Sequence, residues 1–414
     1  MLLTASALLL GWRTGLFNEF FGTIPIFGSV AKLVKGAAGT PEIAGVTFKE
    51  AAKPLCIVIT DKDGARYGVK YDTEARNAVY DRTSSIISEA LGSASVPAEV
   101  NEEEWRTSLS RPGVYFEYFT PVRLSVLDGW LGAHMSNFGK DISLKRIFIA
   151  FGEERSRIYY HDHVSGLFYG ADTAPAAGKA SELEIYSTNG ACFAFETDIR
   201  GRDNAPYMLI MPGRYHPNVY STGAGNALEL LDTSLNAVGH RNETYTTRPD
   251  GEGIIRGVGT QFNITVDLQG RAYYHRTDGL PSEGEQQTLN ESVMIEQSRV
   301  IIADTVKAVC GSADVFFDSI EYSAGDSCSV YFTYFIAGGA VFLFEDGYAA
   351  KITFKSEVIT EIELNYRCFS LAEDSARLLS EDQALAAAEG EFMLFYADTG
   401  AEKLQPFWNR MIYE

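Results

Sequence analysis

The sequence predicts an α+β protein with several domains, in which antiparallel β-sheets pack against helices. The chain has 414 residues, which is more than one compact hydrophobic core usually holds. Aromatic residues make up 12% of it, and its 22 Tyr, 25 Phe and 38 Gly favour strands joined by tight turns. Helical and strand-like patterns occur in separate blocks rather than in strict alternation, which is typical of the α+β class.

Composition also excludes several classes of protein. The chain carries 35 Lys and Arg against 55 Asp and Glu, a net charge of −20. An acidic surface of this kind repels phosphate backbones, so we expect no nucleic-acid partner. The 46% of hydrophobic residues is ordinary for a folded chain and argues against extensive disorder. The 5 Cys are far apart and form no CxxC pair, which argues against a disulfide framework or a zinc site.

The chain starts with an uncharged stretch, MLLTASALLLGW, followed by Arg13. As a helix these residues span about 18 Å, less than the ~30 Å of a bilayer core. Two interpretations are open: a buried core helix, or the outer part of a transmembrane helix whose first part is missing. Trp12 directly before Arg13 suits the membrane interface, where a spanning helix leaves the bilayer.

The first folded region combines a hairpin, helices and further strands. Asp61–Gly64 lies between two β-rich runs and predicts a hairpin, because Gly supplies the positive φ of the turn. Thr73 then caps a helix from about 74 to 91, which has an apolar stripe along one face and is stopped by Gly92. The elements expected after it are a strand at 113–119 broken by Pro121, a short helix at 124–131, strands at 145–151 and 156–161, and a loop at 173–178.

The second half of the chain is richer in strands. Residues 244–277 are typical of a β-meander, with turns at Pro249–Gly251 and Gln269–Gly270. A helix is predicted at 291–309, with Gly311 after it, and a short helix after Ser380. Strands are expected at 315–322, 329–336, 340–344, 349–354, 358–369, 392–396 and 404–413.

These patterns divide the chain into four parts. Gly, Pro and charged residues between 201 and 217 suggest one boundary, and a polar loop at 278–287 suggests another. The parts are 1–38 as the remnant of a transmembrane or juxtamembrane segment, 39–200 as an N-terminal α+β domain, 201–287 as a central β-rich domain, and 288–414 as a C-terminal α+β domain.

Few residues carry a recognisable catalytic or metal-binding pattern. His161 and His163 are two apart on a predicted strand, so both imidazoles could hold one metal ion. A site needs a third ligand, which the sequence does not identify, and an ordinary strand end explains the pair better. Asp61 and Asp63 have the first spacings of a calcium loop, but Arg66 occupies the position that requires Gly. No catalytic, cofactor-binding or metal-binding residues are therefore predicted, and a protein that is not an enzyme is favoured.

Several segments carry a likeness to one known family. Two of them are Gly113–Val122 and Leu124–Gly132, and a third is Tyr245–Arg276 with its Arg-Pro-Asp-Gly turn. Taken together, they resemble YycH-type proteins of Gram-positive bacteria. The segments similar to the C-terminal sheet of that family are Gly338–Val341, Ala350–Phe354, Phe395–Asp398 and Leu404–Trp408, the last of which resembles a strand shared by YycH and YycI. The likeness extends over residues 50–414 and makes the C-terminal domain similar to YycI.

The resemblance implies a regulator with no catalytic residues and no cofactor. Members of the family are single-pass proteins of the cell membrane with a multi-domain α+β body outside the cell. They are associated with the WalK sensor histidine kinase of cell-wall metabolism, and contacts between transmembrane helices matter. By this likeness, the residues that anchor the chain and contact the kinase are Leu2, Leu3, Leu8, Leu9, Leu10 and Trp12. A YycI-like protein or a second copy of the chain is a further candidate partner.

Two other functions are open on the residues alone. The aromatic content would serve a cell-surface module that binds glycan or peptide by stacking, and a cleft with several exposed Trp or Tyr would favour it. The 55 acidic residues also allow a secreted hydrolase with paired carboxylates. Two acids that converge in a deep pocket would favour that function.

Overall fold

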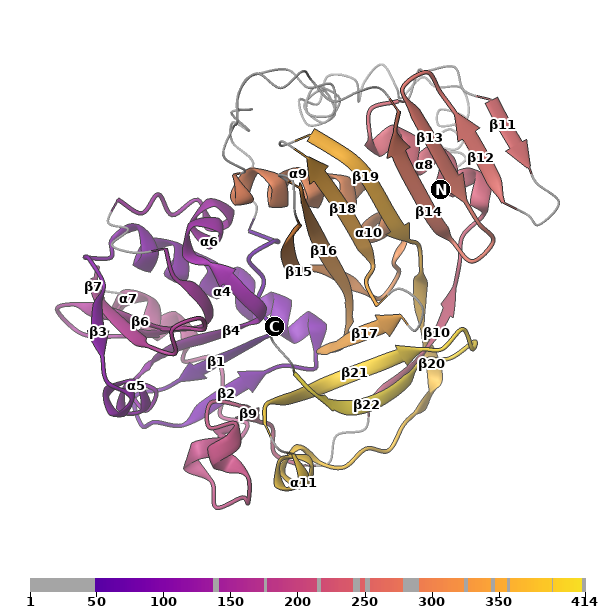
Figure 1. Cartoon of the computed structure of the whole chain (residues 1–414). Helices are drawn as coiled ribbons and strands as arrows, with labels where there is room; N and C mark the ends of the chain where they lie inside the picture. Colours follow the sequence, from indigo (N-terminus) through magenta and orange to yellow (C-terminus); the bar gives the residue numbers. More distant parts are fainter. Residues whose placement is uncertain are drawn as a thin grey trace, which may run out of the picture.

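The computed structural model describes residues 49–411, apart from 137–140, 175–176, 214–216, 241–245, 250–253, 278–289, 324–326, 344–346, 356–357 and 389. The apolar start, most of the predicted turn at 249–251 and the polar loop at 278–287 lie outside these residues. Within them, the predicted α+β class is confirmed: helices pack against two large, mainly antiparallel sheets (Figure 1). The domain limits given above stay a prediction.

The first sheet is formed by seven antiparallel strands in the order β2-β1-β4-β5-β6-β7-β3. Their bounds are β1 (Cys56–Thr60), β2 (Arg66–Val69), β3 (Ala98–Val100), β4 (Gly113–Arg123), β5 (Ser143–Ala150), β6 (Ser156–Asp162) and β7 (Phe168–Thr173). The predicted hairpin is confirmed between β1 and β2: Gly64 has a φ of 79°, and the Asp61 carboxylate accepts hydrogen bonds from the backbone N–H groups of Asp63 and Ala65.

One predicted strand end was wrong. Pro121 does not break β4, which continues to Arg123. The register between β4 and β5 shifts between Glu117 and Val122, so the ladder is already irregular where Pro121 lies. A proline, which lacks an N–H, is tolerated at such an irregularity because no ladder hydrogen bond is lost there.

Both faces of the first sheet are covered, which explains why all five residues of β1 are buried. Helices α4 (Thr73–Gly92) and α6 (Leu124–Leu131) lie on one face. On the other lie α5 (Glu102–Ser108) and the strand pair of β8 (Cys192–Phe193) and β9 (Leu209–Ile210). The predicted cap of α4 was one residue off, because the Asp72 carboxylate, not Thr73, accepts the hydrogen bond from the N–H of Ala75. The predicted loop at 173–178 is also wrong in part, since β7 and α7 (Ala177–Leu183) enter it.

The second sheet is larger and runs in the order β11-β12-β13-β14-β19-β18-β16-β17-β21-β22, with β15 also paired to β16. Its strands are β11 (Thr246–Pro249), β12 (Ile255–Val258), β13 (Phe262–Val266), β14 (Arg271–Arg276), β15 (Asp314–Ser323), β16 (Ser327–Ile336), β17 (Gly339–Leu343), β18 (Ala350–Lys355), β19 (Val358–Asn365), β21 (Phe392–Asp398) and β22 (Gln405–Arg410). The meander is confirmed within the described residues, and so are the later strands except the one expected at 358–369. Among the described pairs, β17 with β21 is the parallel one, and β21 and β22 extend from this sheet toward the first (Figure 1).

Helices cover one face of the second sheet. Two elements that were predicted as continuous are each split in two in the structure. The helix expected at 291–309 is α9 (Glu291–Asp304) followed by α10 (Val306–Val309), because Thr305 leaves the helical conformation and its hydroxyl bonds to the carbonyl of Ile301. The strand expected at 358–369 ends at Asn365, and β20 (Cys368–Ser375) pairs instead with β10 (Asn218–Gly223). Helix α11 (Glu381–Ala387) is capped by Ser380 as predicted, whereas α8 (Ala227–Ala237) was missed.

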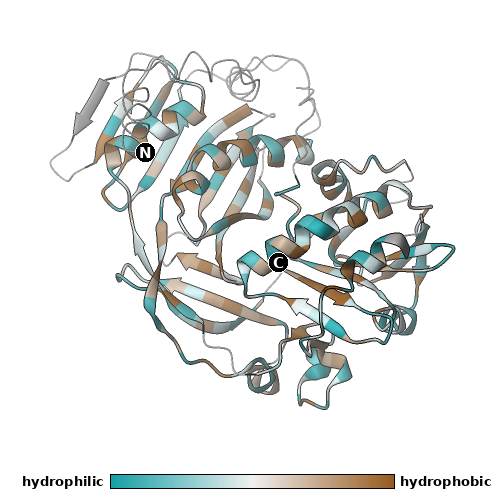
Figure 2. Cartoon of the chain, turned by 180° about the vertical axis from the view of Figure 1, so that it is seen from behind, coloured by the Kyte–Doolittle hydropathy of each residue, from teal (hydrophilic) through white to brown (hydrophobic). Residues whose placement is uncertain are grey.

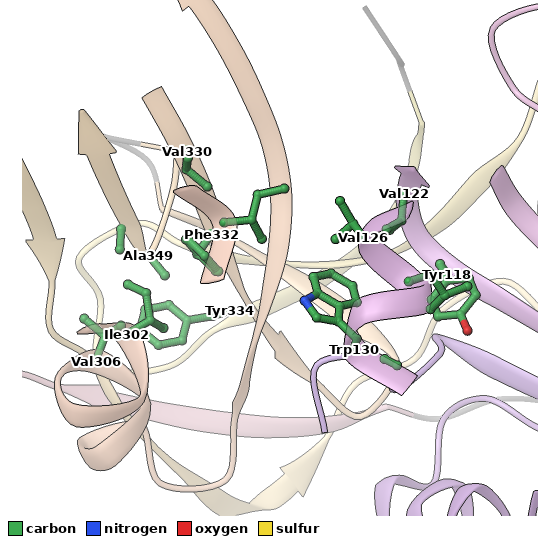
Figure 3. Packing of buried hydrophobic residues seen from close by; sticks show 14 of the residues in the cluster. Tyr118, Val122, Val126, Trp130, Ile302, Val306, Val330, Phe332, Tyr334 and Ala349 are labelled. Atoms are coloured by element: carbon green, nitrogen blue, oxygen red, sulfur yellow. The ribbon is translucent and has the colours of Figure 1, made fainter. Parts of the chain in front are cut away.

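A single hydrophobic cluster connects the two sheets. Figure 3 shows Val126 and Trp130 of α6 on one side and Phe332 and Tyr334 of β16 on the other. The ring of Trp130 meets Phe317 of β15 edge to face at 6.3 Å between centroids, and its indole N–H donates to Glu296 of α9 at 2.5 Å. Seen from behind, the strands carry much of the hydrophobic sequence, whereas the helices alternate between hydrophobic and hydrophilic stretches (Figure 2).

Trp130→Ala is expected to lower the free energy of unfolding by about 3–5 kcal/mol, because it removes a buried aromatic side chain from the junction of the two sheets. Trp130→Phe keeps the ring contact, loses the hydrogen bond to Glu296, and is expected to cost less. Urea denaturation followed by circular dichroism measures both. The control Val96→Ala, at a side chain that is 63% exposed, is expected to change stability by less than ~0.5 kcal/mol. Equal losses of stability in all three variants would contradict the packing of Trp130 between the two sheets.

Candidate functional site

A cleft of about 1040 Å³ lies between the first sheet and one side of the second. One wall is the end of β4, Phe119–Arg123, together with His163 and Val164 after β6. The facing wall comes from the second half of β15, the start of α9, and parts of β17, β21 and β22. The site is therefore built from segments that are up to about three hundred residues apart in the chain. A shallower hollow beside β20 and β22, about 640 Å³, is lined by the surface ion pair of Lys403 and Asp374.

Two unpaired strand edges border the cleft. Strand β4 pairs with β1 only as far as Glu117, opposite Cys56, so its later residues have no strand on that side in the described part of the chain. Strand β15 pairs with β16 along one edge, and no described strand pairs with its other edge. Unpaired strand edges leave backbone N–H and C=O groups available to another extended chain.

The first half of β15 is held firmly against the first sheet. Asp314 forms an ion pair with the buried Arg76 of α4 at 3.4 Å, and Phe317 contacts Trp130. The register of β15 against β16 then shifts between Phe317 and Ser319, with Asp318 as the extra residue of a bulge. A bulge redirects a side chain and bends its strand. The second half of β15 thereby lines the cleft instead of continuing the contact.

Two carboxylates on this wall have no cation partner among the described residues. Asp318 accepts a hydrogen bond from the Thr333 hydroxyl at 3.3 Å, and Glu321 accepts one from Tyr331 at 2.9 Å. Burial raises the pKa of Asp318, the Thr333 hydroxyl lowers it, and the Glu321 carboxylate raises it further. Arg123, on the opposite wall, is already paired with Glu291 at 2.9 Å. The β15 wall is therefore negative, and among the described residues neither Arg123 nor Arg410, the two arginines that line the cleft, forms an ion pair with it.

A buried ion cluster joins the two sheets next to the cleft. It consists of Glu117 of β4, Lys145 and Arg146 of β5, and Glu391, which precedes β21. Lys145 lies 2.9 Å from Glu391 and 3.4 Å from Glu117, and Arg146 lies 3.0 Å from Glu117 and also bonds to Glu391. Lys145 also contacts the sulfur of Met411, which lines the cleft. The side chains of Lys145, Arg146 and Glu117 are less than 10% exposed.

A bulge in β5 explains how two consecutive cations reach the same carboxylates. Leu144 lies opposite Asp162, and Arg146 opposite His161, which leaves Lys145 as the extra residue. In a regular strand the two side chains would point to opposite faces, whereas the bulge lets both turn to one side. Burial alone would raise the pKa of Glu391, but the Arg146 and Lys145 cations outweigh it and hold the pKa well below its usual range.

A second buried ion pair connects the same parts of the structure. Lys70, after β2, donates to Glu381 of α11 at 2.7 Å, and the other oxygen of Glu381 accepts from the backbone N–H of Met211 at 2.6 Å. The hairpin between β16 and β17 abuts this point: a Cβ on Gly338, whose φ is 75°, would lie 2.6 Å from the carbonyl oxygen of Lys70. Only glycine fits there.

The histidine pair does not form a metal site with the residues around it. The ring of His161 lies 4.6 Å from the ring of Phe168, between centroids. Burial, and to a smaller extent the nearby Arg146 cation, lowers the pKa of His161 to about 4. Burial and Lys145 lower the pKa of His163. Both imidazoles therefore lie beside buried cations, which oppose the approach of a metal ion. Among the described residues, no group of three or more His, Cys, Asp or Glu side chains is placed to hold one.

The residues predicted to anchor the chain lie outside the described part of the structure: Leu2, Leu3, Leu8, Leu9, Leu10 and Trp12. Within residues 49–411, with the gaps given above, no helix is both long and apolar enough to cross a bilayer. Sequence reasoning also missed the ion cluster. A signal existed, because Lys145–Arg146 and Glu117 interrupt otherwise apolar strands, and charges in such positions usually pair.

Comparison with known proteins identifies the fold. No family model matches the chain, and no curated protein does. Among solved structures, it is similar to the crystal structure of YycH from Bacillus subtilis, with a TM-score of 0.55 and 14% identity over 88% of this chain and 94% of that one. The chain has a YycH-type fold. An uncharacterized protein from Eubacterium rectale is also similar, at a TM-score of 0.32 and 11% identity over 48% of this chain and 77% of that one, too weak to add to the argument.

The YycH-type fold confirms the resemblance predicted from the sequence, as far as architecture is concerned. The match covers most of both chains, so the similarity concerns the architecture as a whole. At 14% identity the similarity establishes the fold, and the roles of individual residues must be argued from this chain itself.

Glu391→Gln is expected to lower the free energy of unfolding by about 3 kcal/mol at pH 7, because Arg146 and Lys145 would then share one remaining carboxylate. Chemical denaturation measures the change. Glu184→Gln removes an exposed acid with the same chemistry and is expected to have almost no effect. If the two variants lost the same small amount, the buried cluster would not stabilise the fold.

The pH dependence of stability tests the same cluster. The folded-state pKa of Glu391 is depressed below its ordinary value of 4.5, so its contribution is complete above that pH and is lost as the pH falls further. Denaturation at a series of pH values between 7 and 3 is expected to show a steeper loss below about pH 4.5 in the native chain than in Glu391→Gln. The Glu184→Gln control is expected to keep the native slope, and a native slope in Glu391→Gln would refute the assignment.

Proposed function

We propose that this chain is a regulator, not a catalyst, that acts on a cell-wall-sensing histidine kinase of the WalK type through protein–protein contacts. The observation that carries the proposal is the YycH-type fold, shared over 88% of the chain. The sequence segments that resemble YycH-type proteins support it independently of the backbone comparison.

The chemistry beside the cleft is also consistent with a binding role. Lys145, Arg146, Glu117 and Glu391 neutralise one another, so these charged groups serve cohesion between the sheets rather than proton transfer. A hydrolase would place two acids on either side of a scissile bond. Asp318 and Glu321 instead lie on one strand and one wall. Among the described residues that line the cleft, Tyr322 is the one tyrosine and none is tryptophan, which favours protein contacts over glycan stacking.

We further propose that the chain is held at the membrane as a single-pass protein, with most of its residues on the extracellular side. The apolar residues Leu2, Leu3, Leu8, Leu9, Leu10 and Trp12 would then contact the transmembrane helices of the kinase. A neighbouring helix that packs differently against two kinase states needs a coupling of only about 1–3 kcal/mol to change output several-fold. A YycI-like protein or a second copy of the chain is a further candidate partner.

The kinase partner is testable in membranes. We expect the protein, isolated from mildly solubilised membranes of its native cell, to recover a histidine kinase that mass spectrometry identifies. Replacement of residues 2–12 by an unrelated apolar sequence is expected to abolish the recovery and to change kinase autophosphorylation several-fold. Leu371→Ala, at an exposed leucine of β20, is the control and is expected to change neither. Absence of any kinase would refute the proposed function, and recovery despite the replacement would refute the helix contact.

A further inference from the structure

We propose that the cleft binds an extended peptide segment of a partner protein as an added strand along β15, with a Lys or Arg side chain of that segment placed against Asp318 and Glu321. This inference rests on the proposed function, since a regulator that acts by contact needs a surface that recognises its partner. It adds the location of that surface and the chemistry of the segment that it accepts.

The backbone of β15 is the first reason. Its outer edge has no described strand partner, yet its first half is immobilised by the Arg76–Asp314 pair and the Phe317–Trp130 contact. The edge is thus presented in a defined position, so a peptide that pairs with it does not have to order it first. Strand addition to a preformed sheet edge is a common mode of peptide recognition, in which backbone hydrogen bonds provide affinity.

The second reason is charge. Asp318 lies mostly buried in the cleft wall, and the charged group that acts on its pKa is the like-charged Glu321. The desolvation that raises the pKa of Asp318 disfavours its ionised form until a cation arrives. A Lys or Arg that reaches this point would satisfy both carboxylates with charge-assisted hydrogen bonds, which are stronger than neutral ones.

The remaining cleft surface suits apolar side chains. Phe119 of β4 and Phe395 of β21 line it, and Phe342 and Tyr322 at its margins are 45% and 55% exposed. Successive side chains of a bound strand point to opposite sides, so a sequence in which basic and apolar residues alternate would meet both surfaces. A volume of about 1040 Å³ is large enough for several residues of such a segment.

The overall charge selects against a second copy of this chain. With a net charge of −20, two copies repel each other, whereas a basic segment is drawn toward the cleft. The partner segment that fits is therefore basic and extended.

The test uses three fluorescein-labelled hexapeptides as probes: Val-Lys-Val-Lys-Val-Lys, its counterpart with Glu in place of Lys, and the basic peptide with methylated backbone nitrogens. Fluorescence anisotropy with the full chain is expected to show that the basic peptide binds at least tenfold more tightly than each of the others. Hydrogen exchange is expected to show slower exchange of the amides of residues 318–323 when the basic peptide is added.

Asp318→Asn is expected to weaken binding of the basic peptide at least tenfold, because it removes the charge and keeps the size of the side chain. The variant is expected to remain folded, since Asn can still accept the hydrogen bond from Thr333. Glu373→Gln, on exposed β20 away from the cleft, removes the same charge from the chain and is expected to leave binding unchanged. It thus separates local recognition from attraction by net charge.

Equal binding of the basic and acidic peptides, or full binding of the methylated one, would overturn the proposal. So would no binding of the basic peptide, or protection of amides elsewhere than along β15. The kinase recovery experiment remains separate. If a kinase is recovered but the peptide does not bind, only this inference is refuted. If the peptide binds but no kinase is recovered, the proposed function is refuted and the cleft remains a peptide site for another partner.

Discussion

The buried cluster of Glu117, Lys145, Arg146 and Glu391 is the interaction on which the arrangement of the two sheets depends. Three of the four charges belong to the first sheet, where they sit among apolar side chains and would be costly to bury without a second carboxylate. Glu391 supplies it from the second sheet. Docking of the sheets and neutralisation of the cations are therefore one event, and the pair of Lys70 with Glu381 reinforces it from the other end.

The position of the cleft follows from this docking. The ion cluster holds β21, and Arg76 and Trp130 hold the first half of β15. The second half of β15 and the end of β4 therefore stay apart, with the cleft between them. The bulges in β4, β5 and β15 all occur at this junction. They bend the strands away from one another and leave the facing edges of β4 and β15 unpaired. These two edges form a surface suited to an extended partner.

The sequence predicted local structure well where a short signal decided it. The Asp-Gly hairpin, the helix ending at Gly92, the cap at Ser380 and most strands of the second sheet are present. The errors lie where a neighbouring strand or a side-chain hydrogen bond competed with the pattern of the segment. The irregular register opposite β5 tolerates Pro121, and the Thr305 side chain interrupts a helix whose apolar stripe continues through it. The candidate site was not predicted from the sequence. Neither the cleft nor the ion cluster was foreseen, although the charged residues within apolar strands indicated the cluster.

By itself, the sequence determined the α+β class, the Asp-Gly hairpin, several helix ends, the acidic character and the likeness to the YycH-type fold. These properties depend on composition and on residues close together in the chain, through turn conformation, capping and side-chain periodicity. Only the tertiary structure decided that Glu391 meets Lys145 and Arg146, that β17 pairs in parallel with β21, and that Asp318 lines a cleft with no ion pair to a described cation. Those contacts join residues far apart in sequence. Their register is set by bulges and by packing between whole sheets, and no local pattern encodes it.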